Sequence, residues 1–234
     1  MKARLKTLGL IGGMSWESSA EYYRIINQGV RDQLGPKASA QLVLWSFDFA
    51  EIAALQAAGD WPALDALMVD AARRLEAAGA EALVICTNTM HKCAPAIEAA
   101  SPLPLIHIAD PTAAALKVDG HNKVGLLGTA FTMEQAFYRA RLEAQHGLEV
   151  LIPEADDRAE VHRVIYEELV AGRIEASSRA AYRAVIARLV ERGATAIILG
   201  CTEIMLLVGP DDSAVPLYDT TRLHAEAAIA AALT

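Results

Sequence analysis

Two cysteines stand in matching sequence surroundings and are the side chains of this chain best suited to chemistry. Cys86 follows a short apolar run and precedes Thr87, and Cys201 follows another such run and precedes Thr202. A thiolate can accept a proton and a thiol can return one. A pair of cysteines could therefore act as base and acid on opposite faces of one carbon atom, which would invert its configuration.

A cysteine needs a special environment to act as a base near neutral pH, because its ordinary pKa is about 8.5. Each cysteine is expected at the end of a buried strand and before a helix. The backbone amides that follow it there favour negative charge, both on a thiolate and on a bound carboxylate. We expect one thiolate and one thiol, with the roles exchanged for the mirror-image substrate.

The third cysteine, Cys93, has no counterpart in the second half of the chain. Free cysteines are usually buried and behave as small apolar residues, so we expect Cys93 to be a structural residue within a helix. An odd number of cysteines without an export signal also argues against a disulfide framework.

The sequence repeats itself once along its length. The glycine-containing run 8–13 recurs as 124–129, and an Arg-Leu…Gly-Ala segment that begins at Arg74 recurs at Arg188. The Cys-Thr pair recurs at nearly the same separation. A Pro-Leu pair at 104 and 216 is a weaker fourth match, and four matches in one order predict two similar halves.

Short apolar runs alternate with alanine-rich helical stretches, which is typical of an α/β protein with buried parallel sheets. We expect two pseudosymmetric, doubly wound lobes, the first formed by residues 1–112 and 218–234 and the second by 113–217. Ligands bind at the carboxyl ends of the strands in such sheets, so the active site is expected in the cleft between the lobes. The predicted strands are 8–11, 41–46, 82–85, 124–127 and 196–199.

Composition indicates a globular protein with a small-molecule partner. Apolar residues make up 53% of the chain and charged residues 21%, and the net charge is −8. This charge disfavours nucleic acid, which binds clustered Lys and Arg. No apolar run is long enough to span a membrane, and residues 1–16 lack the apolar region of a signal peptide, so we expect a cytoplasmic protein.

The chain resembles the aspartate/glutamate racemase superfamily, and in particular its aspartate-racemase and broad-specificity amino-acid racemase branch. The Cys-Thr-Asn-Thr and Gly-Cys-Thr-Glu motifs, in this order, carry most of the resemblance. It implies a two-lobed, often homodimeric enzyme that racemises free amino acids without pyridoxal phosphate, metal or nucleotide, with Cys86 and Cys201 as acid and base. The matching segments are residues 12–18, 86–92, 132–135, 152–156 and 200–204.

The resemblance also implies which residues contact the substrate. Thr87, Asn88 and Thr89 would bind the α-carboxylate, with Thr202 as their counterpart in the second half. Glu203 has two interpretations, one as a residue that tunes the thiol or contacts the ammonium group, the other as a simple capping residue. The full set of candidates is Met14, Gln56, Thr87, Asn88, Thr89, Thr129, Thr202 and Glu203.

Substrate preference is expected to be broad or mixed. Members of the family that act on acidic substrates carry basic residues for the distal carboxylate at two positions, where this chain has Ile52 and Val170. A side-chain carboxylate would lack its usual charged partner there. We therefore expect neutral or mixed amino acids rather than aspartate alone.

Other types of site fit the sequence less well. A zinc site of Cys86, His91, Cys93 and His107 lacks the usual ligand spacing, and His91 is expected at the start of a surface helix. The glycine turn at 9–13 matches no nucleotide-binding motif. A related cysteine-dependent isomerase or decarboxylase, or a sensor that only binds an amino acid, stays possible.

Overall fold

The computed structural model describes residues 4–234, so the first three residues of the expected first lobe lie outside the described part. The chain forms two compact units. Unit 1 ends at His107 and resumes over His224–Thr234, and unit 2 is Ile108–Leu223. The sequence-based boundaries at 112 and 217 lie a few residues away from these points.

Unit 1 contains a parallel four-stranded sheet in the order β2-β1-β3-β4. The predicted strands 8–11, 41–46 and 82–85 match β1, β2 and β3 to within one residue. The edge strand β4 is only two residues long and was not predicted. The strands are β1 (Leu8–Gly12), β2 (Leu42–Ser46), β3 (Ala82–Ile85) and β4 (Leu105–Ile106).

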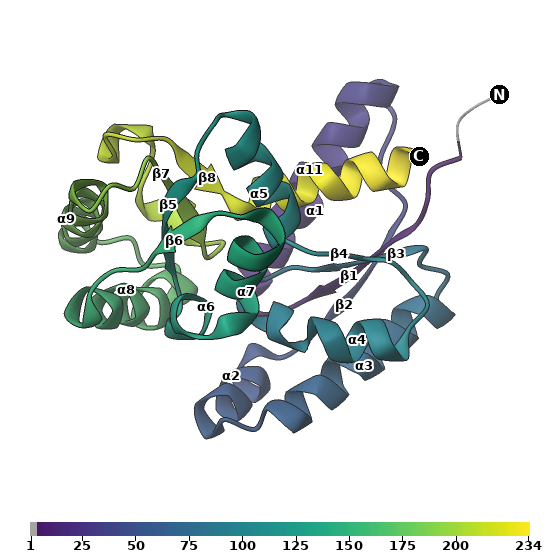
Figure 1. Ribbon diagram of the computed structural model, residues 1–234. Coiled ribbons are helices and arrows are strands. Elements are labelled where there is room, and N and C mark those ends of the chain that lie inside the picture. Colours follow the sequence, from purple (N-terminus) through teal and green to yellow (C-terminus); the bar gives the residue numbers. More distant parts are fainter. Residues whose placement is uncertain (1–3) are drawn as a thin grey trace. The chain divides into compact units, whose positions relative to one another are not determined.

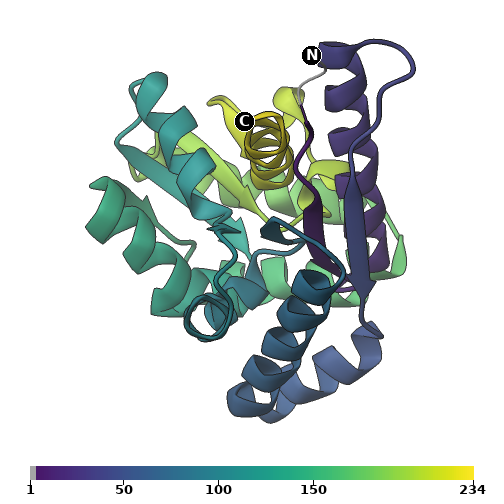
Figure 2. The same ribbon diagram turned by 90° about the vertical axis from the view of Figure 1, so that its right-hand side faces the viewer.

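Helices cover both faces of this sheet (Figures 1 and 2). One face packs against α1 and α11 around Tyr22 and Ile26, and the other packs against α3 and α4 around Met68 and Ile97. The helical segments are α1 (Trp16–Leu34), α2 (Phe49–Ala58), α3 (Trp61–Ala77), the 3-10 helix η1 (Thr89–Cys93), α4 (Ala94–Ala100) and α11 (Thr220–Leu233).

Unit 2 contains a second parallel sheet, in the equivalent order β6-β5-β7-β8. The predicted strands 124–127 and 196–199 match β5 and β7 to within one residue, whereas the three-residue strands β6 and β8 were not predicted. The strands are β5 (Lys123–Gly128), β6 (Glu149–Leu151), β7 (Ala196–Gly200) and β8 (Leu217–Asp219).

A single apolar core joins this sheet to the helices of unit 2. Figure 1 shows α8 and α9 on one side of β5 and α5 and α7 on the other. The helical segments are α5 (Ala109–Val118), α6 (Ala130–Glu134), α7 (Ala136–Ala140), the π-helix η2 (Arg141–Gln145), α8 (Ala155–Glu167), η3 (Leu169–Ala171), α9 (Ala176–Glu191), α10 (Ile204–Leu207) and η4 (Pro210–Asp212).

The unit boundaries follow from the helices that leave each sheet. The apolar residues of α5, which follows β4, belong to the core of unit 2. Those of α11, which follows β8, belong to a core of unit 1. Burial of an apolar helix face decides the unit to which the helix belongs, and this packing cannot be read from local sequence.

The repeated glycines have a packing role. A Cβ added at Gly9 in β1 would lie 2.8 Å from Ala80 Cβ, and one added at Gly125 in β5 would lie 2.6 Å from Ile197 Cδ1. Leu75 and Leu189, from the repeated Arg-Leu…Gly-Ala segments, would also be close, at 3.2 Å and 3.0 Å from the added Cβ atoms. The sequence repeat therefore corresponds to the same packing in both units, in which a helix (α3 or α9) lies close to a glycine of the first strand.

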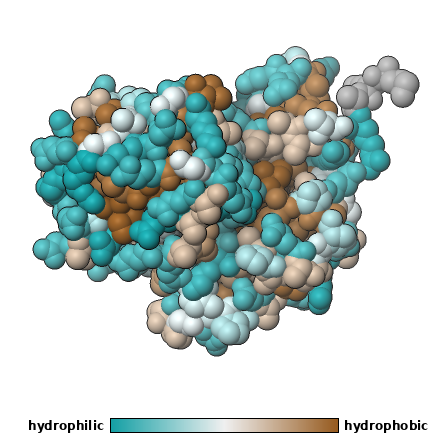
Figure 3. Space-filling view, in the orientation of Figure 1, coloured by the Kyte–Doolittle hydropathy of each residue, from teal (hydrophilic) through white to brown (hydrophobic). Residues whose placement is uncertain are grey.

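The face shown in Figure 3 is mostly hydrophilic, with hydrophobic residues in separate patches. Among residues 4–234, no helix is long and apolar enough to cross a membrane.

Candidate active site

Both sheets have the strand order in which the chain reverses its direction of winding between the first and third strands. The carboxyl ends of those strands form the usual ligand-binding edge of a doubly wound sheet. In unit 1 this edge lies after β1 and β3, where Met14 and Cys86 follow, and in unit 2 it lies after β5 and β7, where Thr129 and Cys201 follow.

Hydrogen bonds hold the backbone of Cys86 on both sides. Its N–H donates to the Ile11 carbonyl at 2.9 Å, and Ser18 Oγ, from the first turn of α1, donates to the Cys86 carbonyl at 2.8 Å. The residue is fully buried. Neighbouring elements of unit 1 therefore fix the position of this cysteine.

The chain after Cys86 enters the 3-10 helix η1, where His91 lies. Its Nδ1 is 2.8 Å from the Thr87 carbonyl oxygen, and its side chain is buried. The expectation of a surface helix beginning at His91 is wrong, because η1 packs its side chains into unit 1. Asn88 and Thr89 are buried beside it.

Cys201 has a carboxylate next to it. Cys201 Sγ donates to Glu203 Oε2 at 3.0 Å, and Thr202 Oγ1 donates to the same oxygen at 2.6 Å. Glu203 is buried and Cys201 is partly exposed. The Glu203 carboxylate therefore accepts hydrogen bonds from both side chains of the second Cys-Thr pair.

Burial raises the pKa of both thiols. At Cys86, burial is the cause of the raised pKa. At Cys201 burial is again the largest cause, the negative charge of Glu203 and its hydrogen bond add to it, and the backbone amides of Thr202 and Glu203 act in the opposite direction. The amide effect expected from the sequence is present at Cys201 but smaller than the cost of desolvation, so this structure favours two neutral thiols.

The other predicted site residues divide between the two units. Met14 lies in the turn after β1 and packs into the apolar core of unit 1. Gln56, on α2, is buried, and its Nε2 lies 3.2 Å from Met90 Sδ in η1. Thr129 caps α6 and accepts from the Thr132 N–H at 3.2 Å.

Two further side chains, both on α8 in unit 2, were not singled out from the sequence. His162 Nδ1 accepts from the Ala130 N–H at 3.2 Å, and its ring centroid lies 4.6 Å from that of Tyr166. Burial lowers the pKa of His162. Burial raises the pKa of Tyr166, and the negative charges of Cys201 and Glu203 add to this effect. Their i, i+4 spacing puts them on one helix face, and this was the available signal.

The two positions considered for binding a distal carboxylate are apolar in the structure as well. Ile52 is fully buried in unit 1, and Val170 is partly buried against the core of unit 2.

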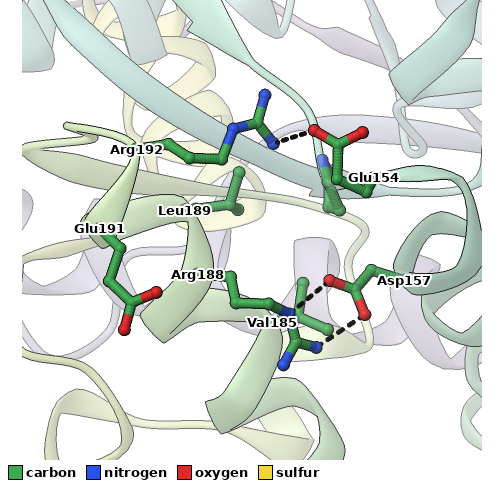
Figure 4. Close-up of a pocket in the computed structure, with 8 residues that line it drawn as sticks. Glu154, Asp157, Val185, Arg188, Leu189, Glu191 and Arg192 are labelled. Carbon is green, nitrogen blue, oxygen red and sulfur yellow. Dashed lines mark hydrogen bonds and ion pairs between the residues drawn. The ribbon is translucent and has the colours of Figure 1, made fainter.

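A hollow in unit 2, between the β6–α8 loop and α9, is distinct from these residues (Figure 4). Arg188 pairs with Asp157 at 2.6 Å and Arg192 with Glu154 at 3.2 Å across it. Both arginines of the hollow are therefore paired with carboxylates that also line it. Within residues 4–234, no group of three His, Cys, Asp or Glu side chains is placed to hold a metal ion.

The two parallel sheets and their matched strand orders define an α/β protein with the two-lobed racemase fold. The chain belongs to the Asp/Glu/hydantoin racemase family, whose model matches residues 11–228. Membership in this family supports a racemase, which is an isomerase.

Solved structures of racemases and their homologues are similar to this chain. A protein from Yersinia pestis named for an Asp/Glu racemase is 56% identical, with a TM-score of 0.92, over 98% of this chain and 100% of its own. An aspartate racemase homologue from Pyrococcus horikoshii is 31% identical, with a TM-score of 0.84, over 98% and 100%. A Francisella tularensis glutamate racemase, solved with D-glutamate, is 16% identical, with a TM-score of 0.65 over 97% and 80%, and shows the fold alone.

Proposed function

We propose that this protein is a cofactor-independent amino-acid racemase in which Cys86 and Cys201 exchange the α-proton of one substrate. The observation that carries the proposal is the duplication of a Cys-Thr pair at the same topological position of two equivalent sheets. Each position is the ligand-binding edge of its sheet. An acid and a base of the same chemical type suit a reaction that runs in both directions.

The reaction balances without a co-reactant. One sulfur, as thiolate, takes the proton from the α-carbon as that C–H bond breaks, and the other, as thiol, gives its proton to the opposite face. Because burial raises the pKa of both thiols, one thiol must lose its proton before it can act as the base. At Cys201 the acceptor is Glu203 Oε2, which lies 3.0 Å from the sulfur.

The proposed binding residues follow the same division between units. Thr87, Asn88 and Thr89 lie directly after Cys86 and are suited by type and position to bind the α-carboxylate. Thr202 is the corresponding residue after Cys201. Met14, Gln56 and Thr129 complete the proposed substrate contacts, and they lie in the turns after β1 and β5 or against η1.

We propose a broad or mixed substrate range. Acidic amino acids are the substrates in the names of the aspartate and glutamate racemases with this fold. The apolar side chains at Ile52 and Val170 offer no charge for a distal carboxylate. The range is tested with a panel of L- and D-amino acids and a hydantoin, and turnover of aspartate alone would contradict it.

Deuterium incorporation at the α-carbon in D₂O tests the mechanism, with wild type compared with Cys86→Ser and Cys201→Ser. Wild type should both exchange and racemise, whereas each single variant should lose racemisation and keep at most exchange of one enantiomer. Cys93→Ser is the matched control, because Cys93 is buried in the core and has no proposed role. Full racemisation by both single variants would exclude the two-base mechanism.

The same experiment separates the alternatives. A decarboxylase would release carbon dioxide and needs only one protonating thiol, so one cysteine variant would stay active. A sensor would bind an amino acid without any exchange at the α-carbon.

We also propose a cytoplasmic homodimer. The three cysteines are free, and the proposed chemistry requires thiols, which a reducing compartment preserves. Trp16 and Tyr23, which are 68% and 53% exposed, lie on one face of α1 and could be buried by a second copy. Light scattering after gel filtration tests the dimer, and Trp16→Lys should dissociate it.

A further inference from the structure

A group of buried histidines in unit 1 lies next to the turn that carries Cys86. The His91 ring centroid is 4.6 Å from that of His107 and 5.5 Å from that of His224. His224 Nδ1 is 2.7 Å from Tyr22 Oη. The four rings come from α1, η1, the end of β4 and α11, and all of them are buried.

The hydrogen-bond partners fix which nitrogens carry protons. A backbone carbonyl can only accept, so His91 Nδ1 must be the donor to the Thr87 carbonyl. For the same reason His224 Nε2 donates to the Ile106 carbonyl at 2.7 Å. In the neutral His224 ring, Nδ1 is then an acceptor and Tyr22 Oη donates to it. His91 Nδ1 therefore donates to the turn that carries Cys86. The His91 ring packs against the His224 ring, whose orientation is fixed by its own hydrogen bonds.

The bond to Thr87 also sets the direction of the next amide. The peptide bond between Thr87 and Asn88 is trans, and in a planar trans peptide the C=O and the following N–H point in opposite directions. With the Thr87 carbonyl turned towards His91, the Asn88 N–H points away from the histidines. Ser18 holds the preceding carbonyl, that of Cys86, so two consecutive peptides are oriented by side chains.

We propose that His91 is a positioning residue that directs the Asn88 backbone amide towards the α-carboxylate of the substrate beside Cys86. The proposal rests on the proposed function for the identity of the ligand. In unit 2, the residue at the same spacing after Cys201 is Leu206, which is 54% exposed and has no side-chain hydrogen-bond donor. There the carboxylate of Glu203 contacts the thiol instead. The two halves of the site are therefore built differently.

The test compares His91→Asn with His91→Phe. The Asn side-chain amide puts an N–H donor at about the distance of Nδ1, whereas Phe fills the ring volume without a donor. His146→Asn is the matched control, because His146 lies in unit 2 and is hydrogen-bonded to Asp110 at 3.0 Å. Melting curves identify any variant that does not fold.

The first readout needs no turnover. In wild type, long-range ¹H–¹⁵N spectra should show the proton of His91 on Nδ1, and the Asn88 amide resonance should shift in His91→Phe but not in His91→Asn or His146→Asn. A proton on Nε2 of His91, or an unchanged Asn88 resonance in His91→Phe, would overturn the proposal. Because the spectra are recorded on the free protein, they decide this point even if no amino acid is racemised.

The second readout is kinetic. His91→Phe should lower kcat/KM by about tenfold to a hundredfold through a misplaced carboxylate donor, while His91→Asn should stay within about threefold of wild type. Equal losses in both variants would show that the ring itself is needed and that the hydrogen bond is not. A wild type without racemase activity, combined with the expected spectra, would refute the proposed function and leave the role of His91 in orienting the amide intact.

Discussion

Glu203→Gln is the substitution that most directly tests how Cys201 becomes a base. In the structure the thiol donates to Glu203 Oε2 at 3.0 Å, and Gln keeps the shape and an acceptor oxygen but neither the charge nor the ability to take a proton. A hydrogen bond to a charged acceptor contributes about 1.5–3 kcal/mol and one to a neutral acceptor about 0.5–1.5 kcal/mol. The difference of about 1 kcal/mol corresponds to less than about tenfold in rate.

Proton transfer to a positioned base contributes more, about a hundredfold to ten-thousandfold. If Glu203 accepts the Cys201 proton, Glu203→Gln should lower kcat/KM at least about a hundredfold. If Glu203 only orients the thiol, the loss should stay below about tenfold. The size of the effect therefore distinguishes a proton acceptor from a positioning group.

The assay follows the loss of circular dichroism from each pure enantiomer. Because the two enantiomers have equal free energy, kcat/KM must fall by the same factor in both directions, which provides an internal check. Glu168→Gln is the matched control, since Glu168 is also buried in unit 2 but is bonded to Ser178 and Arg163. A loss of tenfold or less in a folded Glu203→Gln protein would refute the role of proton acceptor.

Three further outcomes are expected. If Cys201 passes its proton to Glu203 within the site, kcat/KM of wild type should stay nearly constant between about pH 6 and about pH 9, and a rise would contradict that transfer. In Glu203→Gln the proton must leave to solvent, and because burial raises the pKa of both thiols, kcat/KM of this variant should rise over the same range. Gly9→Ala should cost about 1–3 kcal/mol of unfolding free energy and Gly125→Ala less, because the new methyl group meets a rigid Cβ in the first case and the end of a flexible side chain in the second, as urea denaturation would measure. The hydrogen bond from Arg179 lowers the pKa of Asp212 in the folded protein. The Asp212 carboxylate therefore stabilises the fold above its unfolded pKa of about 3.9, and this stabilisation is lost as the pH falls through the lower folded value. Asp212→Asn should weaken the pH dependence of the unfolding free energy, measured by urea titration across acidic pH.

The central strands could be predicted because each is a fully buried apolar run. β3 and β7 carry an apolar side chain at nearly every position, and both were found to within one residue. The edge strands β4, β6 and β8 have two or three residues, too few for any periodicity to appear. The glycine repeat could also be recognised in the sequence. The close neighbours of Gly9 and Gly125 leave little room for a larger side chain at either position.

The boundaries expected from the sequence, at 112 and 217, put α11 with the first lobe and divide α5 between the lobes, although neither helix carries a local signal for its unit. α5 and α11 each follow the last strand of one sheet, and their alanine-rich sequences fit either unit. Their membership depends on which apolar surface buries them, and this is a property of the assembled core.

The chemical groups and their order can be read from local sequence: two Cys-Thr pairs each follow a buried strand, and the polar residues come directly after them. Their environment depends on the folded chain. Burial raises the pKa of both thiols, and the contacts of Glu203 with Cys201 and of His91 with Thr87 depend on how the chain turns after each strand. Desolvation sums over every neighbour in the fold, so it can reverse what the adjacent amides of the sequence favour.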